Sequence, residues 1–255
     1  MIFDSHAHYD DEAFEEDRSS LLFSMQANGI GTIVNVGASL ESSRSSLLLA
    51  ESYDFIYAAV GVHPNDTAQL NEENYLELCK MMDSEKAVAV GEIGLDYYWD
   101  EPERSIQKKW FVRQLHTAME KDKPIIIHSR DAAADTLDIM KAEKPWDCGG
   151  VIHCFSYSVE MAREYLNQGF YIGIGGVLTF NNAKKLKEVA EYTPLSQIVL
   201  ETDCPYLAPV PNRGKRNSSL NLTYVADMLA EIKGITREEV ERATYENACK
   251  LYRIK

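Results

Sequence analysis

The sequence predicts a protein of the α/β class that folds as a (β/α)8, or TIM, barrel with an extra C-terminal helix. Three observations predict this fold. Eight short apolar runs rich in β-branched residues recur along the chain, helical patterns lie between them, and the 255 residues contain no linker or low-complexity tract. We therefore expect one domain, residues 1–255. An open doubly wound sheet is the alternative, although such a sheet normally has fewer strands.

The apolar runs mark the expected strands, because turn-forming or polar residues bound each of them. They are residues 1–6, 31–37, 55–63, 87–94, 124–129, 149–155, 170–176 and 197–203. The first run leads into "SHAHYD", where a doubly wound nucleotide-binding sheet would have a glycine-rich phosphate loop. This difference favours the barrel.

Helical patterns, with apolar residues three and four positions apart, lie between the strands and after the last one. They cover residues 15–29, 72–84, 105–123, 133–144, 158–169, 222–234 and 236–254. Gly29 and Gly169 stand where helices are expected to end, because glycine readily adopts the left-handed conformation of a C-terminal cap. The last pattern is the extra helix, which we expect to pack against the barrel.

The formal net charge of −14 argues against broad adhesion to nucleic acid through a basic surface. A polyanionic substrate would have to be held locally. The segment "PVPNRGKRN" offers Arg213, Lys215 and Arg216 for this purpose, although a solvated turn explains the segment equally well when it is taken alone.

The expected compartment is the cytoplasm. No basic leader opens the chain, and no apolar stretch approaches the roughly 20 residues that a membrane helix needs, so no membrane partner is expected. The five cysteines lack a CxxC pair, which argues against a disulfide framework or a thiolate metal site.

Histidines and acidic residues collect at the C-terminal ends of the expected strands, which surround one mouth in a barrel. They are His6, His8, Glu92, His128, His153 and Asp203. Because side chains alternate across a strand, His6 and His8 point to the same side and can bind one ion. Six ligands exceed the need of one tetrahedral site, so we expect a pair of divalent cations.

Glu92 is the expected bridge between the two ions, because a carboxylate can bind one ion with each oxygen. We expect Asp203 to complete the ion at His6 and His8, and His128 and His153 to hold the other. The ions would lie about 3.5–4 Å apart and share a bridging hydroxide. Zn, Mn, Fe, Co or Ni suit these ligands better than Ca, and Mg fits less well.

Three neighbouring residues have separate interpretations. His63 follows the third strand and is either a substrate contact or a structural turn residue. His116 lies in a helical pattern and is interpreted as a helix-face residue with no catalytic task. Asp4 shares the inward parity of His6 and is expected to orient a histidine.

With these residues in place, the chain resembles the TatD family of metal-dependent deoxyribonucleases, within the amidohydrolase superfamily. Six segments carry the resemblance, in order and over nearly the whole chain: "FDSHAHYD", "GVHPND", "GEIGLDYYW", "PIIIHSRDA", "IHCFS" and "ETDCPYLAPVPNRGKRN". The resemblance implies the six metal ligands already reached from the strand ends. It also implies a phosphodiesterase that cleaves DNA, acting as an exonuclease on single strands, with no obligate protein partner evident.

Roles for individual residues follow from this resemblance. Asp203 would take a proton from the attacking water, and with Glu92 it would form the catalytic pair. Arg130 would bind phosphate oxygens, or else pair with Asp131 or Asp135. The resemblance also favours phosphate binding by the basic segment. Aromatic residues of "DYYW" could stack on a splayed base, although aromatic residues after a strand more often pack.

The chain departs from the family pattern at Cys204, where relatives commonly have serine, and in the basic segment at Asn212, Ser218 and Ser219. These departures leave the preferred nucleic acid open.

One alternative function keeps the metals but changes the hydrolysed bond to an ester or amide, as in removal of an aminoacyl group from tRNA. A non-catalytic binding protein is a further alternative. Lys184, Lys185 and Lys187 are interpreted as a solvated helix start rather than a second phosphate site.

Overall fold

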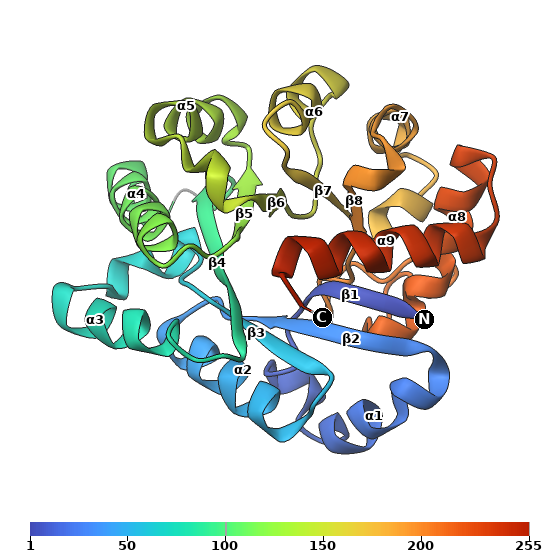
Figure 1. The fold of residues 1–255 in the computed structure, drawn as a ribbon, viewed down its shortest axis with the longest axis horizontal. Helices are drawn as coiled ribbons and strands as arrows, with labels where there is room; N and C mark the ends of the chain where they lie inside the picture. The colour runs from blue at the N-terminus through green and yellow to red at the C-terminus, as the bar shows by residue number, and fades with distance from the viewer. Residues whose placement is uncertain (100, 255) are drawn as a thin grey trace. The chain divides into compact units, whose positions relative to one another are not determined.

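The computed structural model describes residues 1–99 and 101–254, and Figure 1 traces its strands and helices along the chain. The strands are β1 (Ile2–Ala7), β2 (Ile30–Val36), β3 (Ile56–Val60), β4 (Ala87–Asp96), β5 (Ile125–Arg130), β6 (Gly150–Ile152), β7 (Tyr171–Ile174) and β8 (Ile198–Leu200). They form one sheet in chain order, from β1 to β8. In this order every strand neighbours its predecessor, as in a (β/α)8 barrel and unlike a doubly wound sheet. The predicted fold class is confirmed.

Helices alternate with these strands. They are α1 (Arg18–Ser24), α2 (Leu40–Ser52), α3 (Glu72–Met81), α4 (Arg104–Glu120), α5 (Ala133–Glu143), α6 (Val159–Leu166), α7 (Lys184–Tyr192), α8 (Leu222–Lys233) and α9 (Arg237–Tyr252). Short 3-10 turns are η1 (Glu12–Phe14), η2 (Gln26–Asn28), η3 (Pro64–Gln69), η4 (Pro145–Cys148), η5 (Gly176–Thr179), η6 (Leu195–Gln197) and η7 (Ser219–Asn221). No helix within the described ranges is long and apolar enough to span a bilayer.

Some expected boundaries shift for local reasons. The helix expected over residues 15–29 is divided into α1 (Arg18–Ser24) and the 3-10 turn η2 (Gln26–Asn28). A separate turn, η1, precedes it, and Asp11 caps η1 by accepting the N–H of Ala13. Gly29 does end this region in the left-handed conformation, with φ of 87°. Helix α2 lies outside the expected patterns, because its serine-rich sequence has a weak apolar stripe.

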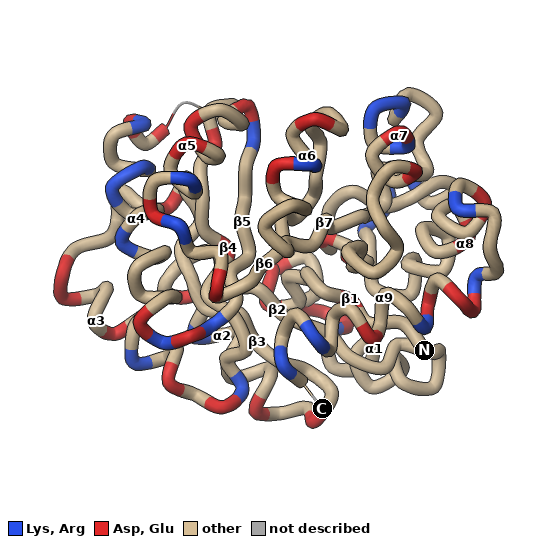
Figure 2. The backbone as a smooth tube through the Cα atoms, turned by 45° about the horizontal axis from the view of Figure 1, so that its top comes forward, with Lys and Arg blue, Asp and Glu red and all other residues tan. Residues whose placement is uncertain are grey.

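The chain divides into two compact units, which we describe separately. The first unit comprises Met1–Asn35 and the described residues from Cys154 onward, and the second unit comprises Val36–His153. The expectation of one domain stays a prediction. Figure 2 shows acidic and basic residues interspersed along helices such as α4, α5 and α6, so neither sign of charge is confined to one helix.

In the first unit, the ends of β1 and β8 are joined. The N–H of Asp203 donates to the carbonyl of His6 at 2.9 Å, and the N–H of His8 donates to the carbonyl of Cys204 at 2.9 Å. β8 ends at Leu200, before the expected end of the run at residue 203. The chain therefore leaves β8 with Asp203 held beside β1.

The C-terminal helix α9 packs on the same strand. The ring of Phe3 meets Tyr245 edge-on at 5.5 Å and stacks on Tyr252 at 5.9 Å, and the Tyr252 hydroxyl donates to the carbonyl of Ser5. A capping box of Thr236 and Glu239 begins this helix. Apolar packing of this kind fixes β1, and with it the residues at its end.

In the second unit, strands β4 and β5 pair over their whole C-terminal halves, with Gly94 opposite His128 and Asp96 opposite Arg130. Gly94 has φ of 146°, and a Cβ atom there would lie 1.9 Å from the carbonyl oxygen of His128. Only glycine permits this approach. The close pairing carries β4 beyond the expected end at residue 94.

Candidate metal centre

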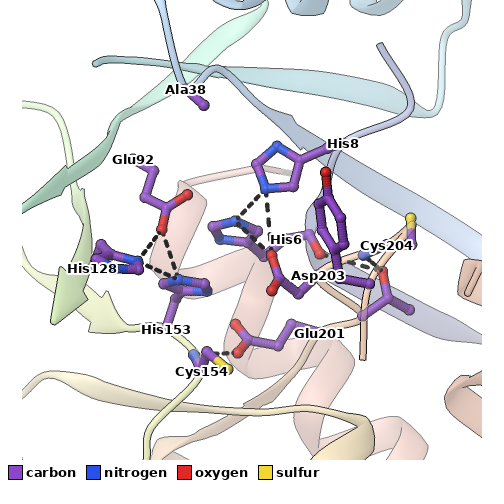
Figure 3. A network of polar contacts seen from close by, with 12 residues as sticks. His6, His8, Ala38, Glu92, His128, His153, Cys154, Glu201, Asp203 and Cys204 are labelled. Carbon is purple, nitrogen blue, oxygen red and sulfur yellow. Dashed lines mark hydrogen bonds and ion pairs between the residues drawn. The ribbon is translucent and has the colours of Figure 1, made fainter. Parts of the chain in front are cut away.

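A group of three metal-type side chains lies in the first unit, at the joined ends of β1 and β8 (Figure 3). The Nε2 atoms of His6 and His8 are 3.1 Å apart. The Oδ1 atom of Asp203 is 3.4 Å from Nε2 of His8 and 3.7 Å from Nε2 of His6. The alternation of side chains along β1 thus places both rings on one side, as the spacing of two predicted.

Asp203 is held by its backbone in this group. It has φ of 55°, which is uncommon for a residue with a side chain. Its N–H bond to His6 and the neighbouring bond between His8 and Cys204 stabilise that conformation. The carboxylate is therefore presented to the two imidazoles by the same bonds that join β8 to β1.

Asp4 supports this arrangement differently from the expectation. Its carboxylate accepts the backbone N–H groups of His6 and Thr202, and the hydroxyls of Thr202 at 2.7 Å and Ser219 at 2.6 Å. Burial raises the pKa of Asp4 to about 6, although these hydrogen bonds oppose the rise. Asp4 thus ties the segment before Asp203 to β1.

A second group lies in the second unit, in the C-terminal halves of β4 and β5 and directly after β6 (Figure 3). The Oε1 atom of Glu92 is 2.6 Å from Nδ1 of His128 and 2.8 Å from Nε2 of His153. These two nitrogen atoms are 3.3 Å apart. Burial opposes ionisation of Glu92, but the adjacent His153 and His128 hold its pKa well below the usual value.

Asp96 orients His128 and was missed by the sequence reasoning. Its Oδ2 atom lies 3.0 Å from Nε2 of His128, the ring nitrogen that faces away from Glu92. Burial disfavours the charged form of His128, whereas Glu92 and Asp96 outweigh it and raise the pKa of the imidazole. A carboxylate on the far nitrogen commonly fixes the orientation of a metal-binding histidine. Asp96 shares the parity of Glu92 along β4, but the strand expected from the sequence ended at residue 94.

His63 lies beside the second group. Its Nδ1 atom accepts the N–H of Asn65 at 3.2 Å, which leaves the proton of the neutral ring on Nε2, 4.0 Å from Oε1 of Glu92. Its ring lies 4.2 Å from that of His128. Burial, followed by the charge of His128, lowers the pKa of His63 to about 3. The ring is therefore a neutral hydrogen-bond donor at neutral pH.

The spacing of the donor atoms is compatible with a divalent cation in the first group and, between the imidazoles, in the second. Ligands at about 2.0–2.2 Å from a tetrahedral ion are separated by roughly 3.3 Å from one another. The donors of the first group are 3.1 to 3.7 Å apart, and the two imidazole nitrogens of the second group are 3.3 Å apart. The Oε1 atom of Glu92 lies at hydrogen-bond distances of 2.6 and 2.8 Å from these nitrogens, which a bound cation would lengthen. Imidazole and carboxylate are also the ligands that Zn, Mn, Co and Ni accept together.

Known proteins match this sequence over its whole length. Residues 3–253 match the family model of TatD related DNases. A metal-dependent hydrolase of Bacillus subtilis, YabD, is 44% identical over the full length of both chains, and YcfH of Escherichia coli K12 is 38% identical over all of this chain and 96% of its own. Both carry the description "uncharacterized".

This chain belongs to the TatD family. Its members of solved structure include YjjV of Escherichia coli K12, which superposes with a TM-score of 0.93 at 31% identity over all of this chain and 98% of that one. A TatD family hydrolase of Entamoeba histolytica has a TM-score of 0.88 at 25% identity, covering 98% and 97%. The TatD membership predicted from six segments is thus confirmed, and with it a metal-dependent hydrolase.

The predicted phosphate contact Arg130 lies in the second unit of this TatD protein. Arg130 ends β5, is exposed, and holds its guanidinium 3.8 Å from the ring centre of Tyr98. Asp135, one suggested partner, instead accepts the Tyr97 hydroxyl and pairs with Lys108. Tyr97 is therefore a packing residue, whereas the rings of Tyr98 and Trp99 are 54% and 64% exposed.

The basic segment of the TatD chain is divided between two environments. Arg213 and Lys215 are exposed, with the guanidinium of Arg213 4.3 Å from the ring centre of Phe180. Arg216 instead forms two hydrogen bonds with the carboxylate of Asp17, at 2.6 and 2.8 Å, and donates to the carbonyl of Ala13. The structure thus gives Arg216 a local partner that the sequence did not suggest.

The residues that depart from the family pattern also have places in the first unit. Cys204 is fully buried, and burial raises the pKa of its thiol. Asn212 donates to Asn221 at 2.9 Å, and Ser219 donates to Asp4. Ser218 donates its N–H to the side chain of Asn217.

His116, in the second unit, is a helix-face residue as expected, because it pairs with Glu143 between α4 and α5.

Proposed function

We propose that the chain is a metal-dependent phosphodiesterase that cleaves DNA, acting as an exonuclease on single strands. The observation that carries the proposal is the pair of three-donor groups, His6, His8 and Asp203 in one unit and Glu92, His128 and His153 in the other. The name of the matching family, TatD related DNase, supports the substrate. The names of the relatives leave the bond open, because they specify only a hydrolase.

Each group would hold one divalent cation, for which Zn, Mn, Mg, Co and Ni are the candidates. Bound cations polarise a phosphoryl oxygen, lower the pKa of water and stabilise a leaving oxygen. Sharing of Glu92 between the two ions, and the hydroxide expected to bridge them, stay predictions.

Asp203 would take the proton from the attacking water. It keeps 19% of its side-chain surface exposed, so water can reach it, and the two imidazoles orient its Oδ1 atom. Glu92 is 5% exposed and flanked by two imidazoles, which suits it to holding a cation rather than to exchanging protons. The two carboxylates therefore divide the predicted catalytic tasks.

Two side chains of the second unit would bind the phosphate. His63 offers a neutral N–H at Nε2, which can donate to a phosphate oxygen without adding charge. Arg130 offers a guanidinium at the end of β5, and its stacking on Tyr98 keeps the planar fork extended. Arg130 can then bind two phosphate oxygens at once.

In the first unit, Arg213 and Lys215 would contact further phosphates of the strand, because both are exposed. Arg216 was predicted to make the same contact. Its pairing with Asp17 favours a supporting role instead, in which it holds the basic segment against the turn before α1. Location in the cytoplasm is part of this proposal, supported by five cysteines that form no disulfide.

Hydrolysis of labelled oligonucleotides tests the function. Protein loaded with Zn, Mn or Mg is expected to shorten single strands labelled at the 5′ or the 3′ end, and Asp203→Asn is expected to abolish the reaction. A parallel assay with an aminoacyl ester of tRNA covers the alternative bond. If the oligonucleotides stay intact while the ester is hydrolysed, the protein is an ester hydrolase and not a phosphodiesterase.

A further inference from the structure

A cavity of about 500 Å³ lies in the first unit, with Asp203 in its wall. Its other walls come from the segment that follows β6, from β7 and η5, and from the first turn of α7. Sites for small molecules typically measure about 300–1,000 Å³. The cavity is thus large enough for one nucleoside beside the candidate metal ligand.

Apolar side chains dominate the walls. They are Phe155, Val177, Leu186 and Leu207. Gly173 leaves room for the carboxylate of Glu201, because a Cβ atom at Gly173 would lie 2.4 Å from Oε2 of Glu201. The Glu201 carboxylate accepts the N–H of Cys154 at 2.5 Å, and both residues line the cavity. Such a lining suits the flat, weakly polar face of a nucleobase better than a sugar or a phosphate.

Charges of opposite sign lie in different walls of the cavity. Glu201 and Asp203 follow β8, whereas Lys184 and Lys185 are exposed and begin α7. The first turn of α7 contains no acidic residue. A ligand that approaches Asp203 through a bound cation can therefore place a second anionic group at the lysines, with its apolar part between them.

We infer that the cavity receives the nucleoside next to the scissile phosphate and that Lys184 and Lys185 bind the following phosphate of the strand. This inference rests on the proposed function, because that function places a phosphate at Asp203. It makes the preferred substrate a nucleoside flanked by two phosphates, as in a dinucleotide with a terminal phosphate or a longer strand. It also reverses the interpretation of these lysines as a solvated helix start.

Binding of thymidine 3′,5′-bisphosphate to the metal-loaded protein tests the inference without turnover. In isothermal titration calorimetry, the double variant Lys184→Ala/Lys185→Ala is expected to bind about tenfold more weakly than wild type. Lys187→Ala is the matched control, since Lys187 lies on the same helix but does not line the cavity. Equal affinity in the double variant and the wild type would overturn the inference.

Kinetics with two diesters separates this inference from the proposed function. For a 5′-phosphorylated thymidine dinucleotide, the double variant is expected to raise KM about tenfold with kcat unchanged. Hydrolysis of methyl p-nitrophenyl phosphate, which has neither base nor second phosphate, is expected to be unchanged. If wild type hydrolyses neither diester, the proposed function fails. If wild type hydrolyses both and the lysine variant matches it on both, only the inference fails.

Discussion

The Nε2 atom of His128 lies 3.0 Å from the Oδ2 atom of Asp96, and the opposite ring nitrogen faces Glu92 at 2.6 Å. The Asp96 carboxylate therefore fixes the orientation of the ring, while the Glu92 carboxylate lies beside the ring nitrogen that would bind a cation. The relationship depends on Gly94, which lets β4 pair with β5 closely enough for Asp96 to reach the ring.

Asp96→Asn is expected to weaken cation binding at His128 by about 10- to 100-fold, because the amide orients the ring less strongly than the carboxylate. The metal content of the variant, measured after dialysis at a fixed free Zn concentration, should fall by one ion per chain. Asp135→Asn is the control, since Asp135 pairs with Lys108 and Tyr97. An unchanged metal affinity in Asp96→Asn would show that Asp96 does not orient His128 for cation binding.

Gly94→Ala is expected to destabilise the protein by at least about 3 kcal/mol, because the new Cβ atom would collide with the backbone of β5. Gly234→Ala is the matched control, because Gly234 has a left-handed backbone with φ of 65° and ψ of 34°, and no atom lies within 4 Å of the new Cβ. This substitution should reduce the free energy of unfolding only by the cost of placing alanine in the left-handed conformation, about 1–2 kcal/mol. Urea unfolding measures the free energy of unfolding of both variants. Equal decreases in the two variants would show that the backbone moves to relieve the collision.

Asp4 is expected to make stability depend on pH. Its pKa is about 6 in the folded chain and about 3.8 when unfolded, so the folded state binds the proton more tightly. The stabilisation is complete below pH 4 and is lost as the pH rises through 6, an effect of about 3 kcal/mol at most.

Asp4→Asn removes this titration while keeping two hydrogen-bonding atoms. Unfolding free energies measured from pH 4 to pH 7 in chelator should therefore fall with pH more steeply in wild type than in Asp4→Asn. Parallel curves would mean that Asp4 has an ordinary pKa in the folded chain.

Arg216 and Asp17 are expected to act as one unit. If Arg216 only supports the basic segment, Arg216→Ala and Asp17→Ala should raise KM for a single-stranded oligonucleotide by similar factors, and the double variant should add little. Lys215→Ala should instead reduce the salt dependence of binding, because a phosphate contact releases counterions. A much larger effect of Arg216→Ala than of Asp17→Ala would return Arg216 to the predicted phosphate contacts.

The sequence was most informative where local pattern determines structure. The alternation of side chains in β1 predicted that His6 and His8 share one side, and the succession of apolar runs predicted the strand order. Asp96 was overlooked because the expected strand ended at residue 94, and only pairing with β5 continues β4 to Asp96. Propensity within one segment carries no information about such pairing.

Contacts between distant segments were beyond the sequence. Asp4 accepts the hydroxyl of Ser219, and Asp17 pairs with Arg216, across about 200 residues in each case. The cavity beside Asp203 likewise arises from four separate segments. Such features follow from the assembled fold, in which no single motif specifies the partner.

The metal content of three proteins tests the central claim, that each group holds one divalent cation. Elemental analysis of wild type, His8→Ala and His153→Ala, after loading with Zn and removal of the excess, measures it directly. We expect two ions per chain in wild type and one in each variant. A wild type with no more than one ion, or a variant that keeps two, would contradict the claim.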